Sequence, residues 1–184
     1  MSLYLTLSLA TLTIYVPSQY RTVTGTMKDS VNICTAVMIS KNTALTADHC
    51  IEDITGSIAV EHSKKAIVKI IKKDAVRDLA LLQVLKVNKP YVKLGPEPYI
   101  TERVYTVNSG QGHENTYDEG IIQNIDKDDP DDAQVHIQDS IHIAQGASGS
   151  GLFNAKGELI GINVISMETG SLAVDTLTIR NFLK

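Results

Sequence analysis

The chain is divided into many short apolar runs by turn-forming residues, and this pattern constrains its fold more than any other feature. Runs such as TALTA, AIVKII, RVYTVNS and GELIGINVIS are strand-like, and clusters of Gly, Asn, Asp or Lys separate them. Short strands with frequent turn signals are typical of β-barrels and β-sandwiches. The sequence therefore predicts an all-β fold.

The strand-rich sequence divides into two halves. Residues 94–101, LGPEPYIT, contain Pro96 and Pro98 and form the best candidate linker, because proline interrupts regular strand pairing. We therefore expect one β unit over residues 21–93 and a second over residues 102–184.

One helix is predicted, at the C-terminus. Asp175 or Thr176 can cap the segment TLTIRNFLK. Within it, an apolar stripe is formed by Leu177, Ile179, Phe182 and Leu183. Such a stripe is expected to pack against the β body.

The first twenty residues are apolar and leave two interpretations open. The stretch MSLYLTLSLATLTIYV carries no charge and could be the apolar region of an export signal, although it lacks preceding basic residues. Its Leu5, Leu7 and Leu9 also alternate with Thr6, Ser8 and Ala10, as in a half-buried strand.

Composition excludes some classes of partner. A chain of 184 residues that is 43% hydrophobic can bury a substantial core. Its 17 basic and 21 acidic residues give a net charge of -4 and form no basic stripe, so we expect no nucleic-acid partner. After Tyr20 no uncharged apolar run reaches about 18 residues, so no membrane span is expected in the body of the chain.

The small-residue stretch AQGASGSGLF raises the question of whether Ser148 is a nucleophile or part of a flexible loop. A nucleophilic serine needs a histidine base and a carboxylate that orients this base. The α/β-hydrolase pattern fails, because position 150 is not glycine and no histidine follows His142. The order His49, Asp78, Ser148 is available instead.

Three motifs in this order carry a family resemblance. TADHC resembles the histidine motif of chymotrypsin-fold serine proteases, RDLALLQV resembles their aspartate segment, and GASGSGLF resembles their Gly-x-Ser-Gly-Gly-Pro-Leu loop. GELIGIN and the closing SLAVDTLTIRNFL are most similar to HtrA/Deg-type bacterial trypsin-like peptidases. The resemblance runs from about Cys34 to Lys184 and includes no PDZ-like module. It implies two six-stranded antiparallel β-barrels with a C-terminal helix, together forming one peptidase unit.

The resemblance also implies roles for individual residues. Ser148 would attack the substrate carbonyl, His49 would carry the proton, and Asp78 would orient His49, as in the Ser-His-Asp triad of that family. The N–H groups of Gly146 and Ser148 would form the oxyanion hole. Gly149 would permit close approach of the backbone.

Three positions depart from the family pattern. Ala147 stands where zymogen-activated relatives have an acidic residue, so we expect no such activation. Asp48 replaces a small apolar residue and could compete for the imidazole. Ser150 replaces a glycine and could crowd the loop or form a hydrogen bond within it.

The chain has two cysteines, Cys34 and Cys50. A disulfide with the same separation surrounds the histidine motif in animal chymotrypsin-like enzymes, so the resemblance implies a bridge here. Two free thiols are the alternative, and a metal site with His49 is disfavoured because further paired ligands are missing. A bridge would imply an oxidising compartment, that is, a secreted or periplasmic protein.

In the family that this chain resembles, one pocket binds the substrate side chain before the cleaved bond. The resemblance implies that this pocket is formed by the segment before Ser148 and by the strand that follows GELIG. This mapping gives His142, Ile143, Asn163, Val164, Ile165 and Ser166. No carboxylate stands among them, so cleavage after Lys or Arg is expected to be disfavoured and Val, Leu or Ala accepted. If His142 points inward, a preference for Glu or Gln is the alternative.

The remaining polar groups are interpreted as structural. DKDDPDD, residues 126–132, lacks the Gly and distal Glu of an EF-hand, so a solvated turn is favoured over a calcium site. His62, His113 and His136 have no evident partners in the sequence.

We therefore expect a serine endopeptidase that acts on polypeptides through an acyl-enzyme, without metal or cofactor. A catalytically silent binding protein of the same fold and a self-processing peptidase are the alternatives.

Overall fold

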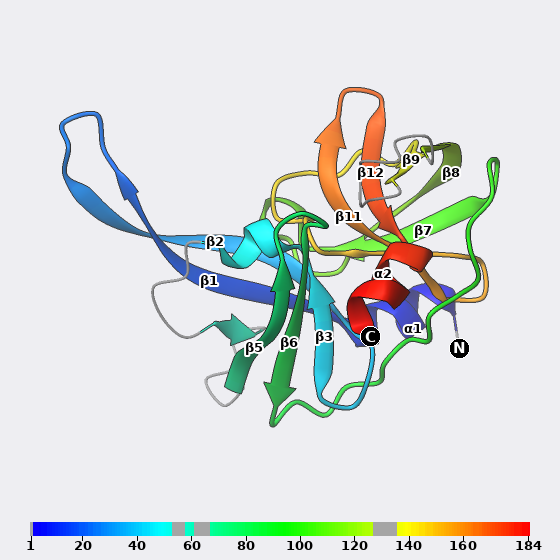
Figure 1. The fold of residues 1–184 in the computed structure, drawn as a ribbon, viewed down its shortest axis with the longest axis horizontal. Helices are drawn as coiled ribbons and strands as arrows, with labels where there is room; N and C mark the ends of the chain where they lie inside the picture. The colour runs from blue at the N-terminus through cyan, green and yellow to red at the C-terminus, as the bar shows by residue number, and fades with distance from the viewer. Residues whose placement is uncertain (1, 53–57, 61–66, 127–135) are drawn as a thin grey trace.

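The computed structural model describes residues 2–52, 58–60, 67–126 and 136–184. Two antiparallel β-sheets form two halves that lie against each other (Figure 1). This confirms the all-β prediction. His62 and residues 127–132 of the acidic segment lie outside the described residues.

The first sheet has six strands in the order β4-β1-β2-β3-β6-β5. Its strands are β1 (Thr11–Arg21), β2 (Met27–Met38), β3 (Thr43–Thr46), β4 (Ala59–Val60), β5 (Ile67–Asp74) and β6 (Leu79–Leu85). Within the described residues no ladder joins β4 to β5, so this sheet is a half-barrel and differs from the closed barrel that we expected. The described part of β4 pairs with β1 at Ile14 and Tyr15, and residues 61–66, between β4 and β5, lie outside the described residues.

The second sheet closes into a barrel, in the order β10-β11-β12-β9-β8-β7, as predicted. Its strands are β7 (Arg103–Asn108), β8 (Thr116–Asp126), β9 (His136–Asp139), β10 (Gly151–Phe153), β11 (Leu159–Met167) and β12 (Gly170–Asp175). The segment before β7 is attached to this barrel, because Gly95 donates its N–H to Leu159 O and accepts a hydrogen bond from Arg180.

The N-terminal apolar segment begins with a helix, α1 (Leu3–Ala10), followed directly by β1. Of the two interpretations left open, the half-buried strand is therefore wrong for Leu5–Ala10, and the export signal stays a prediction. The hydroxyl of Ser2 caps the helix by accepting a hydrogen bond from Leu5 N–H. Leu7 and Ala10 are buried three residues apart, which is a helical spacing that the sequence also contains.

The C-terminal helix, α2 (Thr176–Leu183), is present as predicted. Asp175 is its cap, and its carboxylate accepts a hydrogen bond of 2.8 Å from Thr178 N–H. Ile179 and Phe182 are buried, but Leu177 faces outward, so the apolar stripe is narrower than expected. In the described part of the chain, neither α-helix is long enough and apolar enough to cross a membrane.

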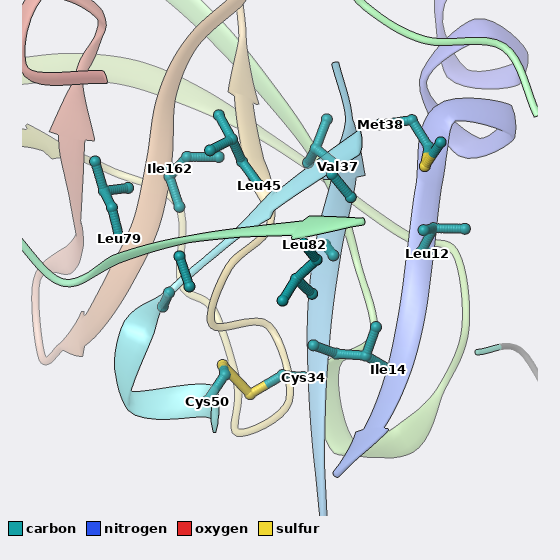
Figure 2. Packing of buried hydrophobic residues seen from close by; sticks show 14 of the residues in the cluster. Leu12, Ile14, Cys34, Val37, Met38, Leu45, Cys50, Leu79, Leu82 and Ile162 are labelled. Carbon is teal, nitrogen blue, oxygen red and sulfur yellow. A yellow bond between two sulfur atoms is a disulfide. The ribbon is translucent and has the colours of Figure 1, made fainter. Parts of the chain in front are cut away.

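One apolar core joins the two halves. Figure 2 shows side chains from β1, β2, β3 and β6 meeting inside the first sheet, with Ile162 of β11 in the same cluster. Val107, Phe153 and Phe182 of the second half belong to this cluster too. Apolar side chains of both halves therefore meet at their boundary.

The outer parts of β1 and β2 form a long hairpin that projects from the body (Figure 1, blue). Pairing runs without a register shift from Thr11↔Val37 to Arg21↔Met27. Val23 at the turn is fully exposed, and Val31 on β2 is 58% exposed.

Candidate active site

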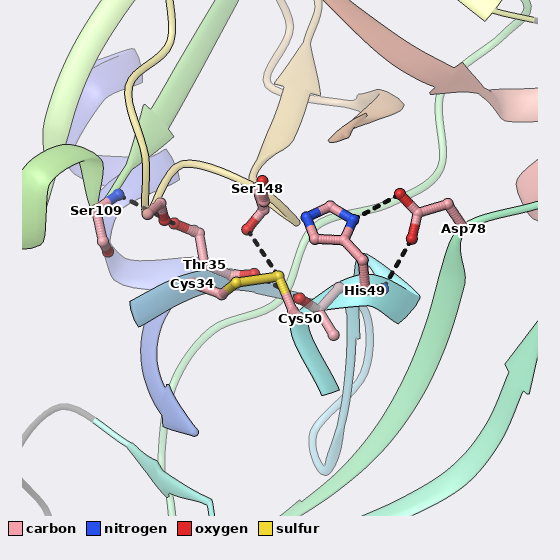
Figure 3. Close-up of a disulfide and its surroundings, with 9 residues drawn as sticks. Cys34, Thr35, His49, Cys50, Asp78, Ser109 and Ser148 are labelled. Carbon is pink, nitrogen blue, oxygen red and sulfur yellow. Dashed lines mark hydrogen bonds and ion pairs between the residues drawn. A yellow bond between two sulfur atoms is a disulfide. The ribbon is translucent and has the colours of Figure 1, made fainter. Parts of the chain in front are cut away.

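His49 lies in a short 3-10 helix, η1 (Asp48–Ile51), that follows β3. Cys50 in the same turn forms a disulfide with Cys34 of β2, with the two Cα atoms 6.1 Å apart. The chain has no free cysteine, so the free-thiol alternative does not hold. The bridge attaches the turn that carries His49 to β2 of the first sheet (Figure 3).

Asp78 lies at the end of the turn between β5 and β6. Asp74 organises this turn, because its carboxylate accepts hydrogen bonds from the N–H groups of Val76 and Arg77. Asp78 itself has a left-handed φ of 48°. This conformation places its carboxylate against His49 (Figure 3).

His49 and Asp78 are joined by two hydrogen bonds. Nδ1 of the imidazole lies 2.7 Å from Asp78 Oδ2, and the backbone N–H of His49 donates to Asp78 Oδ1 at 2.9 Å. Because a carboxylate only accepts, Nδ1 carries the hydrogen and Nε2 is free to act as a base.

This pair changes the pKa of both groups. The hydrogen bond to Asp78 raises the pKa of His49 above its ordinary 6.5, and this effect outweighs burial, which acts in the opposite direction. Burial alone would raise the pKa of Asp78, but the hydrogen bonds and charge of His49 lower it by more. Asp78 is therefore ionised at neutral pH.

Ser148 lies in the loop between β9 and β10, which is held from both sides. Thr35 of β2 donates its N–H to Ser148 O at 2.9 Å, and Gly149 donates to Asn163 O at 2.8 Å. Gly149 has φ +82°, and a Cβ there would lie 2.2 Å from Thr35 O. Glycine is therefore required at this position, where the loop touches the first sheet.

Ser148 and His49 line the same cavity, and Figure 3 shows the imidazole between Ser148 and Asp78. Within the described residues the Ser148 hydroxyl makes no hydrogen bond. Catalytic hydrogen bonds are often long without substrate, so this is compatible with a role for Ser148 as nucleophile.

The N–H groups of Gly146 and Ser148 donate to no acceptor in the described parts of the chain. The N–H of Ala147, which lies between them, donates a hydrogen bond to Ala144 O at 2.9 Å. Gly146 has φ +100°, and a Cβ there would lie 2.5 Å from Ser109 O. Gly146 and Ser148 both line the cavity that His49 also lines.

Two residues that depart from the family pattern, Asp48 and Ser150, are buried. Asp78, not Asp48, bonds the imidazole, and Asp48 is buried with no hydrogen-bond partner for Oδ1. Ser150 is also buried, and its hydroxyl accepts hydrogen bonds from Asn163 Nδ2 at 2.9 Å and from Thr106 at 3.3 Å. It therefore anchors the loop instead of crowding it.

The six residues mapped to the substrate pocket lie on β11 and in the loop before Ser148. His142 is exposed, with Nε2 3.2 Å from Glu168 O, and Ser166 donates to Ile143 O at 2.8 Å. Val164 is buried, whereas Ile165 is about half exposed. The Asn163 side chain bonds Ser150 and Thr106 inside the barrel.

None of these six residues lines the cavity at Ser148. This cavity lies on the β2 side of Ser148 and has a volume of about 620 Å³. It is lined by Ser30, Val31, Asn32, Ile33, Cys34, His49, Cys50, Gln111, Gly112, Gln145, Gly146 and Ser148. Sequence reasoning missed the β2 residues and Gln111, which follow no motif. The one sequence signal was that residues 30–33 directly precede Cys34.

His113 is exposed after η2 (Gly110–Gly112), and His136 begins β9; neither lines this cavity. Among the described residues no group of three or more His, Cys, Asp or Glu side chains is arranged to hold a metal ion.

Relatives with curated names match most of the chain. It is 34% identical over 132 residues to a probable periplasmic serine endoprotease DegP-like of Pseudomonas putida strain GB-1, covering 69% of this chain and 28% of the relative. A protein of the same name from Ectopseudomonas mendocina is 32% identical over 154 residues, covering 80% and 32%. The chain spans about a third of the length of these relatives.

Solved structures share the fold. The HtrA-type protease AlgW with decapeptide has a TM-score of 0.81 at 20% identity, covering 98% of this chain and 65% of that chain. The serine endoprotease from Yersinia pestis has a TM-score of 0.79 at 24% identity, covering 98% and 64%.

The family model described as Trypsin-like peptidase domain matches residues 34–162, which is more than half of the chain and includes all three motifs. The family resemblance is thereby confirmed: this chain belongs to the trypsin-like peptidase domain family.

Proposed function

We propose that the chain is a serine endopeptidase that uses Ser148, His49 and Asp78. The observation that carries this proposal is the His49–Asp78 pair, hydrogen-bonded at 2.7 Å, beside Ser148 at one cavity. An oriented base next to a serine on a tight loop is what nucleophilic catalysis requires.

Acylation begins when Ser148 Oγ attacks the carbonyl carbon of the scissile peptide and His49 Nε2 takes the hydroxyl proton. The carbonyl oxygen becomes an anion, to which the N–H groups of Gly146 and Ser148 can donate. Each such donor is worth about 2.7–4 kcal/mol in the transition state. When the C–N bond breaks, His49 returns the proton to the leaving amine.

Deacylation repeats these steps with water. His49 takes a proton from water, whose oxygen attacks the acyl-enzyme, and then returns it to Ser148 Oγ as the carboxylic acid leaves. Throughout, the Asp78 carboxylate stabilises the imidazolium and stays ionised, in keeping with its lowered pKa. No metal or cofactor enters these steps.

The mapped pocket favours uncharged residues before the cleaved bond. None of its six residues is acidic, and His142 is exposed and lies next to Glu168 O. We therefore propose Val, Leu or Ala at this position, with Lys and Arg disfavoured. A peptide-library digest at pH 7.5 tests this; dominant cleavage after Lys or Arg, or a Glu preference lost in His142→Ala, would contradict it.

The names of the relatives point to the periplasm, and the disulfide suits an oxidising compartment. We propose that the chain acts on polypeptides outside the cytoplasm.

Labelling with a fluorophosphonate probe, followed by mass mapping, tests the nucleophile. We expect the probe to modify Ser148 and labelling to disappear in Ser148→Ala and His49→Ala. Ser8→Ala is the matched control, because Ser8 lies on α1 outside the cavity. Labelling should fall as pH drops through a His49 pKa above 6.5. Labelling that persists in Ser148→Ala would overturn the assignment, and no labelling of the folded wild type would favour a silent binding protein.

A further inference from the structure

Asp139 is a buried carboxylate that the proposed mechanism does not use. It is the last residue of β9 and is 0% exposed. Ile141 donates its N–H to Oδ1 at 2.8 Å, and the hydroxyl of Ser171, on β12, lies 3.0 Å from both carboxylate oxygens. Within the described residues Asp139 forms no ion pair. Burial of a charge without a cation is costly for folding.

Asp139 joins the two segments that carry the mapped substrate pocket. The first segment runs from Asp139 to Ile143 and leads into the loop of Ser148, and the second is the hairpin of β11 and β12 (Figure 1, orange). The hairpin packs directly on the first segment, because a Cβ on Gly170 would overlap Asp139 O. Ser166 donates a hydrogen bond of 2.8 Å to Ile143 O across the same boundary. These contacts set the spacing of the two pocket walls.

The hydrogen bonds of Asp139 depend on its protonation state. An ionised carboxylate only accepts, and both the N–H of Ile141 and the hydroxyl of Ser171 can donate to it. A proton added at Oδ2 turns this oxygen into a donor, so Ser171 Oγ would have to accept instead. The contact between β9 and β12 therefore differs between the two states.

Burial raises the pKa of Asp139 to about 6, although the hydrogen bonds from Ile141 and Ser171 and the charge of His142 oppose this rise. Of the described charged groups, His142 is the one that shifts this pKa. The other carboxyl and imidazole groups on β8, β9, β12 and the turn after β11 are Asp118, Glu119, Asp126, His136, Glu168 and Asp175. Because the pKa is raised, the stability that Asp139 contributes is lost as pH rises from 3.8 through about 6.

Resting on the proposed endopeptidase function, we propose that Asp139 is a positioning residue for the substrate pocket, and that its carboxylate sets the spacing of the pocket walls through Ile141 and Ser171. With Asp139 ionised, the walls are fixed, and an apolar side chain that touches both walls is preferred over a short one. With Asp139 protonated, the walls shift and this preference weakens. Such contacts matter, since one methylene in an apolar pocket changes kcat/KM by about 10–200-fold.

The ratio of kcat/KM for two peptides tests this proposal. The peptides differ only in carrying Leu or Ala before the cleaved bond, and both are measured from about pH 5 to about pH 8. Both need His49 in the same protonation state, so the titration of His49 cancels in the ratio. We expect the Leu-to-Ala ratio to fall about fivefold as pH drops through about 6, the size of one net hydrogen bond. A constant ratio in the wild type would overturn the proposal.

Asp139→Asn separates positioning from a purely structural role. Its side chain stays neutral and can still pair with Ile141 and Ser171, so the ratio should keep its low, acid value at every pH. Tm at neutral pH should rise, because a buried charge is removed. A purely structural role would change Tm and leave the ratio and its pH dependence as in the wild type.

The matched control is Asp175→Asn. Asp175 is also a buried aspartate on β12, but it lies at the other end of the strand from Ser171 and accepts a hydrogen bond from Thr178 N–H. The ratio in this variant should follow the wild type at every pH. A ratio that is changed equally in both variants would contradict a specific role for Asp139.

Ser171→Ala provides a second test that keeps the carboxylate. The Ser171 hydroxyl lowers the pKa of Asp139, so its removal should move the midpoint of the ratio to higher pH. A transition that persists in Asp139→Asn and disappears in His142→Gln would belong to His142, and the proposal would be wrong.

This proposal and the peptidase proposal fail in different ways. Absence of both fluorophosphonate labelling and turnover overturns the peptidase mechanism. A labelled, active enzyme whose Leu-to-Ala ratio is independent of pH overturns the role of Asp139 alone. Binding of the two peptides to Ser148→Ala, followed by fluorescence anisotropy, needs no turnover and should show the same pH dependence; equal Kd ratios at both ends of the pH range would again refute the role of Asp139.

Discussion

At the residue scale, Asp48 is the departure from the family pattern with the clearest consequence. It is 4% exposed, directly precedes His49, and has no partner for Oδ1. Burial raises its pKa, while Lys73 opposes this rise and nearby Asp78, Glu52 and Asp74 add to it. The Asp48 charge also raises the pKa of His49. A buried carboxylate oxygen without a hydrogen-bond partner is costly for folding, and the Asp48 charge acts on the neighbouring imidazole.

We therefore predict that Asp48→Ala lowers the pKa of His49, because the imidazolium loses a neighbouring negative charge. In the pH profile of kcat/KM, the loss of activity on the acid side should then move to lower pH. The variant should also be more stable at neutral pH, by about 1 kcal/mol. A raised pKa favours the protonated fold, so the contribution of Asp48 to stability falls as pH rises above 3.8, and the gain in Asp48→Ala should vanish below that pH.

The control for this prediction is Glu52→Ala. Glu52 also raises the pKa of His49, but it is exposed, so its effect should be smaller and should disappear in high salt. An unchanged pH profile in Asp48→Ala would refute the electrostatic role, whatever happens to stability.

At the element scale, the disulfide connects η1 to β2, and Cys50 Sγ lies 3.6 Å from Ser148 O. The bridge thus touches the elements that carry His49 and Ser148. Because it closes a loop with a sequence separation of 16, the chain-entropy model gives about 3 kcal/mol of stabilisation.

We predict that Cys34→Ala/Cys50→Ala lowers the free energy of unfolding by about 3 kcal/mol in urea. It should also lower kcat more than KM, since η1 loses its attachment. Mass analysis after alkylation without reductant provides the check: two alkylated cysteines in the purified wild type would mean that no bridge exists.

At the scale of the whole molecule, the two halves share one core, in which Ile162 of the closed barrel belongs to the same cluster as Leu45 of the first sheet. A shared core favours unfolding in one step, because neither half can separate without exposing apolar surface. The hydrogen bond between Thr13 and Ser109 hydroxyls, 2.6 Å apart, adds a polar contact across this boundary.

We predict a single calorimetric transition whose calorimetric and van't Hoff enthalpies agree. Ile162→Ala should destabilise this one transition by about 2–5 kcal/mol, without splitting it. Two resolved transitions, only one of them moved by Ile162→Ala, would show that the halves fold independently.

The sequence by itself determined the features that depend on neighbouring residues. Turn residues between alternating runs indicated the strands, Asp175 indicated the start of the last helix, and three local motifs placed His49, Asp78 and Ser148 in order. The Leu5–Ala10 run misled because a strand and a helix both fit its spacing over so few residues, and burial of Leu7 with Ala10 selected the helix.

Only the tertiary structure decided what lies beside these residues. Thr35 and Ser148 are far apart in the sequence, yet their hydrogen bond holds the loop that carries Ser148 against β2. Likewise Asn163, mapped to the pocket by its motif, turns its side chain inward to Ser150. Local pattern encodes backbone preference, whereas the neighbours of a side chain depend on how distant strands pack, which no short stretch of sequence contains.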